Sequence, residues 1–214
     1  MGEKRSIVMI RSTSRLVDSE RTQDWRPKLF KLIWRPKLDM KILVAYASVH
    51  GATEEVAGRV AATLRETGSS VDLVPVRQVR SLSGYQAVVL GAPIYLGHVN
   101  RDALRFLSRY REAFSGGLPV AIFAGGHLRD DASEREEVRK GLEQELASLS
   151  WLRPASVELI GGKVDPTRLR LPWRLLPAMR QIPPSDLRDW EAIHDWAREL
   201  ITQFSSILSS KKVL

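Results

Sequence analysis

Three short segments of this sequence combine glycine with residues that could bind an anion or a flat ring. The first, residues 48–53, leads directly into an expected helix, where backbone amides and the hydroxyls of Ser48 and Thr53 could hold a phosphate without any Lys or Arg. The spacing of its glycine and hydroxyl residues differs from that of the glycine-rich loops that bind ATP or NAD, so neither ATP nor NAD is the expected ligand. The alternative is that Ser48 and Thr53 only cap the helix. The second segment runs from Gly91 to His98 and the third from Ala124 to Leu128.

Alternating strand and helix patterns must position these segments. Five apolar runs predict strands at 41–47, 71–76, 86–90, 118–124 and 156–160, the third ending at Gly91 and the fourth at Gly125-Gly126. Helices are expected over 52–67, 100–114, 132–149 and from 185 or 186 to 207. Such alternation predicts a doubly wound parallel α/β sheet with helices on both faces. Ligands of these sheets bind beyond the carboxyl ends of the strands, so the three segments should meet there.

The three segments resemble those of the flavodoxin family. Ser48, Gly51 and Thr53 match its Ser/Thr-x-x-Gly-x-Thr phosphate loop, and Glu54-Glu55-Val56-Ala57 is similar to its helix start. The resemblance implies a flavodoxin-like five-stranded sheet of order 2-1-3-4-5 and a bound FMN. In that family the other two segments embrace the flavin ring, and Tyr95 is our candidate ring cover, with packing on its own loop as the alternative. The implied cofactor contacts are Ser48, Val49, His50, Gly51, Ala52, Thr53, Ala92, Pro93, Ile94, Tyr95, Leu96, Gly97, Gly125, Gly126 and His127.

Within that family, residues 40–207 are more similar to the quinone-dependent protoporphyrinogen oxidases. The shared features are the Gly-Ala-x-Ile-x-x-Gly-His pattern of residues 91–98, Trp151 to Pro154, Gly161-Gly162 and Asp189-Trp190. The chain departs from them in its glycine-rich third segment and in having Tyr95-Leu96 where an Arg-Tyr pair is expected. The resemblance implies oxidation of protoporphyrinogen IX to protoporphyrin IX, with a membrane quinone, menaquinone or ubiquinone, as electron acceptor.

His98 is the candidate catalytic residue. Porphyrinogen oxidation removes a hydride equivalent from a meso carbon and a proton from a pyrrole nitrogen, and a histidine near the flavin edge could accept that proton. The alternative is a purely structural hydrogen-bonding role. No pair among the four histidines has the His-x-x-x-His spacing of a metal site, so no metal is expected.

The net charge of +8 is concentrated in two parts of the chain. Residues 1–39 hold ten basic and five acidic residues, and residues 163–180 hold five basic residues and one acidic residue. The second part belongs to a basic aromatic insertion at 163–184, which could contact an anionic membrane or the carboxylates of a tetrapyrrole; covering the sheet edge is the alternative. No nucleic-acid motif accompanies the charge, so no nucleic acid is expected. The candidate contacts are Arg168, Arg170, Trp173 and Arg174.

Residues 1–39 are interpreted as a basic N-terminal extension whose aromatic and basic side chains could lie at a membrane interface; the alternative is that this extension is disordered or not native to the protein. Residues 40–207 are interpreted as the flavodoxin-like domain, and 208–214 as a tail. The 214 residues contain no cysteine, which excludes disulfides and cysteine nucleophiles, and no apolar run approaches the roughly 20 residues of a bilayer span. We therefore expect a cytoplasmic protein with peripheral contact at the inner face of the cytoplasmic membrane; a homo-oligomer is left open.

Two other functions remain. A flavodoxin that carries electrons between proteins has no small substrate, but such carriers are typically acidic, whereas this chain is basic. The second function is that of a binding module that has the same fold but holds no flavin, because a fold alone does not define a function.

Overall fold

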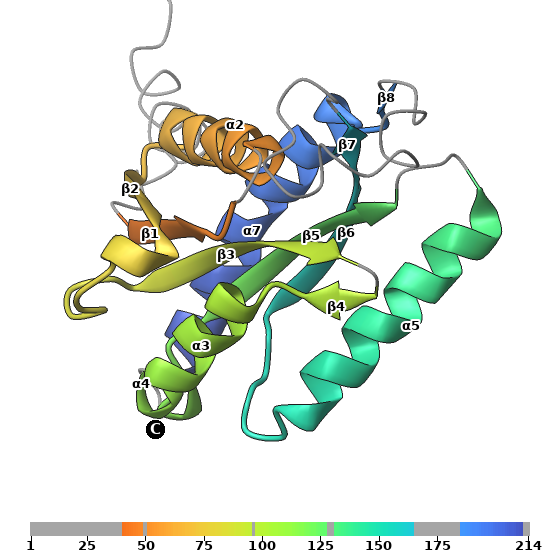
Figure 1. Ribbon diagram of the computed structural model, residues 1–214. Coiled ribbons are helices and arrows are strands. Elements are labelled where there is room, and N and C mark those ends of the chain that lie inside the picture. The colour runs from red at the N-terminus through yellow and green to blue at the C-terminus, as the bar shows by residue number, and fades with distance from the viewer. Residues whose placement is uncertain (1–39, 49–50, 96, 128–130, 165–184, 212–214) are drawn as a thin grey trace, which may run out of the picture. The chain divides into compact units, whose positions relative to one another are not determined.

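The computed structural model describes residues 40–48, 51–95, 97–127, 131–164 and 185–211, without the side chains of His127 and Val164 (Figure 1). The chain divides into two units, Met1–Pro36 and Lys37–Leu214, and all the described residues belong to the second. The predicted N-terminal extension, most of the basic insertion and the end of the tail lie outside the described residues.

Five parallel strands form the central sheet. They are β1 (Lys41–Tyr46), β2 (Ser70–Pro75), β3 (Ala87–Tyr95), β5 (Val120–His127) and β6 (Ser156–Gly161), in the order β2-β1-β3-β5-β6. The two-residue strand β4 (His98–Val99) pairs antiparallel with the end of β3. Counting only the parallel strands, the order is the predicted 2-1-3-4-5. Residues 42–45 and 87–94 are buried, as continuous apolar strands covered on both faces should be.

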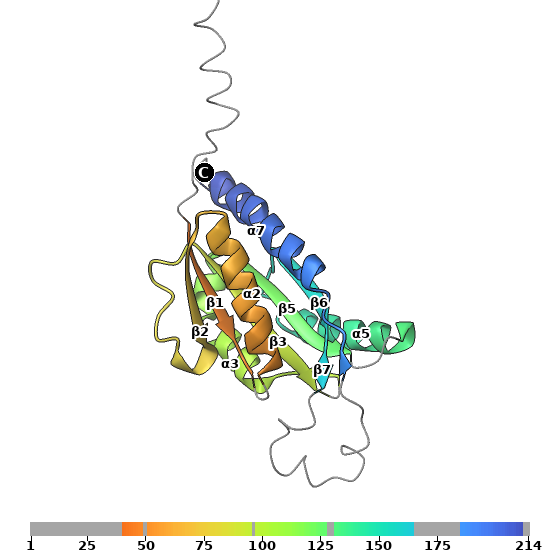
Figure 2. The ribbon, with the colours of Figure 1, turned by 90° about the horizontal axis from the view of Figure 1, so that it is seen from above.

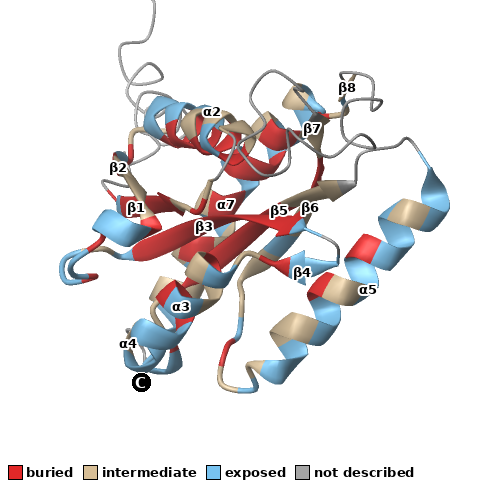
Figure 3. Ribbon diagram, in the orientation of Figure 1, coloured by how far each residue is buried: buried red, intermediate tan, exposed pale blue. Residues whose placement is uncertain are grey.

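Helices cover both faces of this sheet (Figures 1 and 2). α2 (Ala52–Glu66) and α7 (Trp190–Lys211) pack on one face, and α3 (Arg101–Arg109), α4 (Arg111–Ser115) and α5 (Ala132–Ser148) on the other. One short 3-10 helix, η1, covers Val76–Gln78. Figure 3 shows the buried strands between helices whose outward sides are exposed. No helix in the described ranges has both the length and the apolar character needed to cross a bilayer.

Two strands run further than the sequence predicts. β3 continues through Gly91 to Tyr95, and β5 continues through Gly125 and Gly126 to His127. Glycine weakens a strand because it has no side chain to pack. Here both glycines are held by pairing with strands on either side: Gly91 pairs with Tyr46 and Phe123, and Gly125 pairs with Pro93 and Ile160. The second and third segments are therefore partly strand rather than loop.

The predicted helix boundaries also need two corrections. The expected helix over 100–114 is divided into α3 and α4 at Tyr110, whose hydroxyl donates to the Val79 carbonyl at 3.0 Å and whose ring packs edge-on against Phe106. The last helix begins at Trp190 rather than at 185 or 186, and it ends at Lys211 rather than at 207. Ser185–Asp186 instead forms β8, which pairs antiparallel with β7 (Lys163–Val164).

Candidate functional site

The first segment connects β1 to the N-terminus of α2. The Ser48 hydroxyl oxygen accepts a hydrogen bond from the Gly51 amide at 3.0 Å, and Gly51 has the left-handed φ of 89°. The Glu55 amide donates the first helical bond to the Gly51 carbonyl, so the amides of residues 52–54 precede the intrahelical ladder. These amides and the positive end of the helix dipole suit an anion. Ser48 thus caps the turn while its own proton can still be donated; Val49 and His50 lie outside the described residues.

Two acidic residues in the first turn of α2 would repel an anion, and both are engaged elsewhere. Glu54 accepts a hydrogen bond from the Tyr46 hydroxyl at 2.8 Å, and burial together with this carboxylate raises the pKa of Tyr46 to about 12. Glu55 accepts from Lys163 at 3.0 Å and from Arg188 at 2.8 Å. Two cations therefore compensate the charge of Glu55, whereas Glu54, among the described residues, accepts only from a neutral hydroxyl and keeps its charge. Repulsion of an anion at this helix end is thus reduced at Glu55 alone.

Arg188 is the centre of an ion-pair group, which we call the Arg188 cluster: Glu55, Lys163, Asp186 and Arg188. Its guanidinium pairs with Asp186 at 2.5 Å and with Glu55 at 2.8 Å, and it lies 4.4 Å from the Trp190 ring centroid. The Arg188 side chain is 3% exposed. The cluster thereby ties the first turn of α2 to β7, with which the insertion begins, and to β8, which follows it.

The Arg188 cluster is expected to lose its stabilising effect in acid. Burial alone would raise the pKa of Glu55, but hydrogen bonds from Lys163 and Arg188 outweigh it and lower the pKa; the hydrogen bond from Arg188 likewise lowers the pKa of Asp186. A carboxylate with a lowered pKa in the folded state stabilises the fold above its unfolded pKa of about 4 and loses that contribution as the pH falls through its folded value.

Urea unfolding measured from pH 7 into this acid range should therefore show a falling free energy of unfolding, and Arg188→Met should flatten the fall. Lys41→Met is the matched control, because Lys41 and Asp72 form an exposed pair at 3.6 Å. An acid dependence that is the same in all three proteins would contradict the assignment to this cluster.

The second segment is a tight hairpin. Tyr95 pairs with His98 across a two-residue turn, in which Gly97 adopts the left-handed φ of 77° that such turns require. Paired residues project on the same face of a hairpin, so the Tyr95 ring, 43% exposed, and the exposed His98 imidazole share one surface. Leu96 lies outside the described residues. The side chains of Ala92, Pro93 and Ile94 are buried in β3, so a ligand beyond the strand end could meet only their backbone.

The third segment forms the end of β5. The register between β5 and β6 shifts between Gly125 and His127, which places Gly126 in an irregularity of the strand. A Cβ at Gly126 would lie 2.8 Å from Val138 and 3.0 Å from Ile94, so glycine is needed there for packing of α5. Residues 128–130 lie outside the described ranges.

The structure gathers these segments at one sheet edge, as predicted. The Ala47 amide donates to the Gly91 carbonyl at 2.8 Å, and Pro93 pairs with Gly125, so the carboxyl ends of β1, β3 and β5 lie side by side (Figure 1). The roles of the predicted cofactor contacts remain proposals, and the insertion contacts lie outside the described residues. Glu145 and the Arg188 cluster were not among the predicted site residues. Glu145 is 47 residues from His98 and Glu55 is 133 residues from Arg188, so these two contacts leave no local signal in the sequence.

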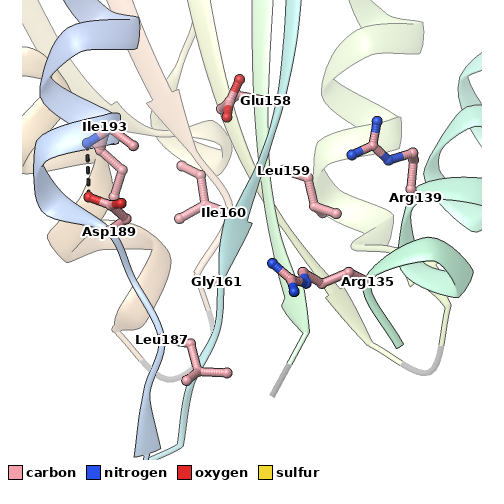
Figure 4. Close-up of a pocket in the computed structure, with 10 residues that line it drawn as sticks. Arg135, Arg139, Glu158, Leu159, Ile160, Gly161, Leu187, Asp189 and Ile193 are labelled. Atoms are coloured by element: carbon pink, nitrogen blue, oxygen red, sulfur yellow. Dashed lines mark hydrogen bonds between the residues drawn. The ribbon is translucent and has the colours of Figure 1, made fainter. Parts of the chain in front are cut away.

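A separate hollow of about 410 Å³ lies at the open edge of β6, between α5 and α7 (Figure 4). Arg135 and Arg139 extend into it from α5, and Asp189 and Ile193 line its other side. Burial raises the pKa of Glu158 on the intervening strand, although Arg139 opposes the rise. Of the residues predicted to contact a cofactor, none in the described ranges lines this hollow. Within those ranges no group of three or more His, Asp or Glu could hold a metal ion.

The sheet order and the sequence place the protein in a known class: the chain belongs to the flavodoxin domain family, whose profile matches residues 43–179. It is 25% identical over 175 residues to protoporphyrinogen IX dehydrogenase (quinone) of Escherichia coli K12, an alignment covering 75% of this chain and 94% of that protein. It is also 30% identical over 100 residues to NAD(P)H dehydrogenase (quinone) of Cupriavidus metallidurans, covering 36% of this chain and 48% of that protein. The predicted family is confirmed.

Solved flavodoxins are similar at low sequence identity. Oxidised flavodoxin 1 from Bacillus cereus has 18% identity and a TM-score of 0.46, with coverage of 78% of this chain and 97% of that one. An archaeal flavodoxin has 12% identity and a TM-score of 0.48, with coverage of 78% and 99%.

Proposed function

We propose that this chain is an FMN-dependent oxidoreductase that oxidises protoporphyrinogen IX to protoporphyrin IX and passes the electrons to a membrane quinone, menaquinone or ubiquinone. The observation that carries the proposal is the alignment with the Escherichia coli dehydrogenase, which spans 94% of that protein and so includes its whole domain rather than a shared loop. The basic charge of this chain separates it from acidic carrier flavodoxins.

FMN would bind at the edge where β1, β3 and β5 end. Its phosphate would be held by the Ser48 and Thr53 hydroxyls and by the first-turn amides of α2, where Lys163 and Arg188 compensate the charge of Glu55. The half-exposed Tyr95 ring would cover the isoalloxazine, and the backbone at 92–97 and 125–127 would line its edge. Bound FMN supplies the acceptor for a hydride equivalent.

His98 would accept the proton that leaves a pyrrole nitrogen. Its side chain is 81% exposed and shares a face with Tyr95, so a flat substrate stacked at the flavin would reach the imidazole. The tetrapyrrole carboxylates, or an anionic membrane at the cytoplasmic face, would be bound by Arg168, Arg170, Trp173 and Arg174 of the insertion. The Arg188 cluster contacts β7, with which the insertion begins, and β8, which follows it.

Flavin binding is the first test. The purified protein should bind FMN more tightly than riboflavin, and Ser48→Ala should weaken FMN binding by about tenfold, since a hydrogen bond to a charged group contributes about 1.5–3 kcal/mol. Flavin fluorescence quenching measures both. Riboflavin is the internal control, because it lacks the phosphate and its affinity should be unchanged in the variant. Equal affinity of the native protein for FMN and riboflavin would contradict the proposed phosphate-binding site.

Activity is the second test of the same proposal. FMN-loaded protein, incubated anaerobically with protoporphyrinogen IX and a menaquinone analogue, should produce fluorescent protoporphyrin and three quinols for each porphyrin, because the oxidation removes six electrons and each quinone accepts two. Omitting the quinone should stop the reaction after one two-electron step, when the bound flavin is reduced and before porphyrin forms. If FMN-loaded protein forms no more porphyrin than the flavin-free control, the proposed substrate is contradicted. A flavodoxin that carries electrons between proteins would then be the remaining function.

A further inference from the structure

His98 is not an isolated loop residue, because a carboxylate from another element contacts it. The Nδ1 atom of His98 lies 3.0 Å from Oε1 of Glu145 in α5, and Oε2 of the same carboxylate accepts the amide of Val99 at 3.0 Å. Both carboxylate oxygens are therefore used on two consecutive residues of β4. The Glu145 side chain is 22% exposed, whereas that of His98 is 81% exposed, so the carboxylate is the fixed member of the pair.

Backbone packing places Glu145 at this position. One turn before it, Gly141 lies against the hairpin turn so closely that a Cβ there would come within 2.7 Å of the Gly97 carbonyl oxygen. One turn earlier still, Val138 packs against Gly126 and Ile94. α5 thus contacts the second and third segments along three successive turns, which fixes the distance between Glu145 and β4.

We propose that Glu145 is a positioning residue that holds His98 in the Nδ1–H tautomer, with Nε2 as the atom that accepts a proton. An ionised carboxylate can only accept hydrogen bonds, so the imidazole nitrogen facing Oε1 must carry the hydrogen. Within the described residues Nε2 has no protein partner, and the side chain that carries it is exposed on the hairpin face that His98 shares with Tyr95. The catalytic meaning of this tautomer rests on the proposed function, whereas the tautomer itself does not.

In the Glu145→Gln variant we expect the opposite tautomer of His98, with the hydrogen on Nε2. The Val99 amide still needs an oxygen, so the glutamine carbonyl turns to it and the glutamine NH₂ group faces Nδ1. A donor facing Nδ1 requires a lone pair there, which moves the imidazole hydrogen to Nε2. Glu143→Gln is the matched control, because Glu143 is exposed on the same helix and its change removes the same charge.

Long-range ¹⁵N–¹H correlation spectra of FMN-loaded, ¹⁵N-histidine-labelled protein measure the tautomer directly, at a pH where the imidazole is neutral. His98→Gln identifies the His98 signals among the four histidines. We expect Nδ1–H in the native protein and in Glu143→Gln, and Nε2–H in Glu145→Gln. Nε2–H at His98 in the native protein overturns the proposal without any variant, and so does an unchanged tautomer in folded Glu145→Gln.

Activity separates positioning from a structural role. Since general acid–base catalysis contributes roughly 100-fold or more, Glu145→Gln should lower the porphyrin-forming rate by about tenfold in the native background and little in the His98→Gln background. An equal loss in both backgrounds would mean that Glu145 acts only on the fold, and overturns the proposal. If no protein, including the native one, forms porphyrin, the proposed function fails, and the spectra alone decide whether Glu145 sets the tautomer.

Discussion

Replacing Phe123 by alanine is expected to lower the free energy of unfolding by about 3–5 kcal/mol, the range for removing a buried phenylalanine. Phe123 is 1% exposed in β5, its ring lies directly over Gly91 of β3, and it packs edge-on against Trp196 at 6.1 Å between centroids. The cavity would open beneath the edge that we assign to FMN. Urea unfolding with FMN in excess measures the change, and a loss below about 1 kcal/mol would contradict this account of the core.

The same contact can be tested from its other side. A Cβ at Gly91 would overlap the Phe123 ring, so Gly91→Ala should cost about 1–3 kcal/mol, and this cost should shrink when Phe123 is leucine. Gly125→Ala is the matched control on the next strand, because its Cβ would meet only the Ile160 carbonyl oxygen at 3.9 Å. Equal costs for Gly91→Ala with Phe123 and with leucine would show that the ring does not require the glycine.

Replacing Arg188 by methionine has the second large expected effect, a loss of about 2–3 kcal/mol. Removing one partner of a buried ion pair costs about 3–5 kcal/mol, because the other charge stays buried without compensation. Here the carboxylates left behind are 34% exposed at Glu55 and 40% exposed at Asp186, and Lys163 remains beside Glu55, so solvent and Lys163 reduce the cost.

Thermal or urea unfolding of Arg188→Met, compared with Lys41→Met, measures this effect. The exposed Lys41 pair should contribute less than about 1 kcal/mol. Because the Arg188 cluster joins α2 to β7 and β8, the variant should also bind FMN more weakly than the control does. A loss no larger than that of Lys41→Met would contradict a stabilising role for the cluster.

Much of the fold could be predicted from the sequence, for a physical reason. Strands buried on both faces are continuous apolar runs such as residues 42–45, and helices between them repeat their apolar residues with a helical period, so the local sequence indicates each element. The alternation of strand and helix then restricts the topology, because crossovers between parallel strands have one hand. The turn between β1 and α2 was also predictable, since Ser48, Gly51 and Thr53 lie within six residues of one another; its binding of a phosphate stays a prediction.

The chemistry around these elements was decided by the tertiary structure. β3 continues through Gly91 because Phe123, 32 residues away, covers it, and a glycine gives no sign of which neighbour will fill its space. Glu145 reaches His98 only because Gly141 lets α5 approach the hairpin, and Arg188 meets Glu55 across 133 residues of chain. Local sequence sets backbone preferences, whereas an ion pair or a tautomer depends on which distant side chain the packing brings within about 3 Å.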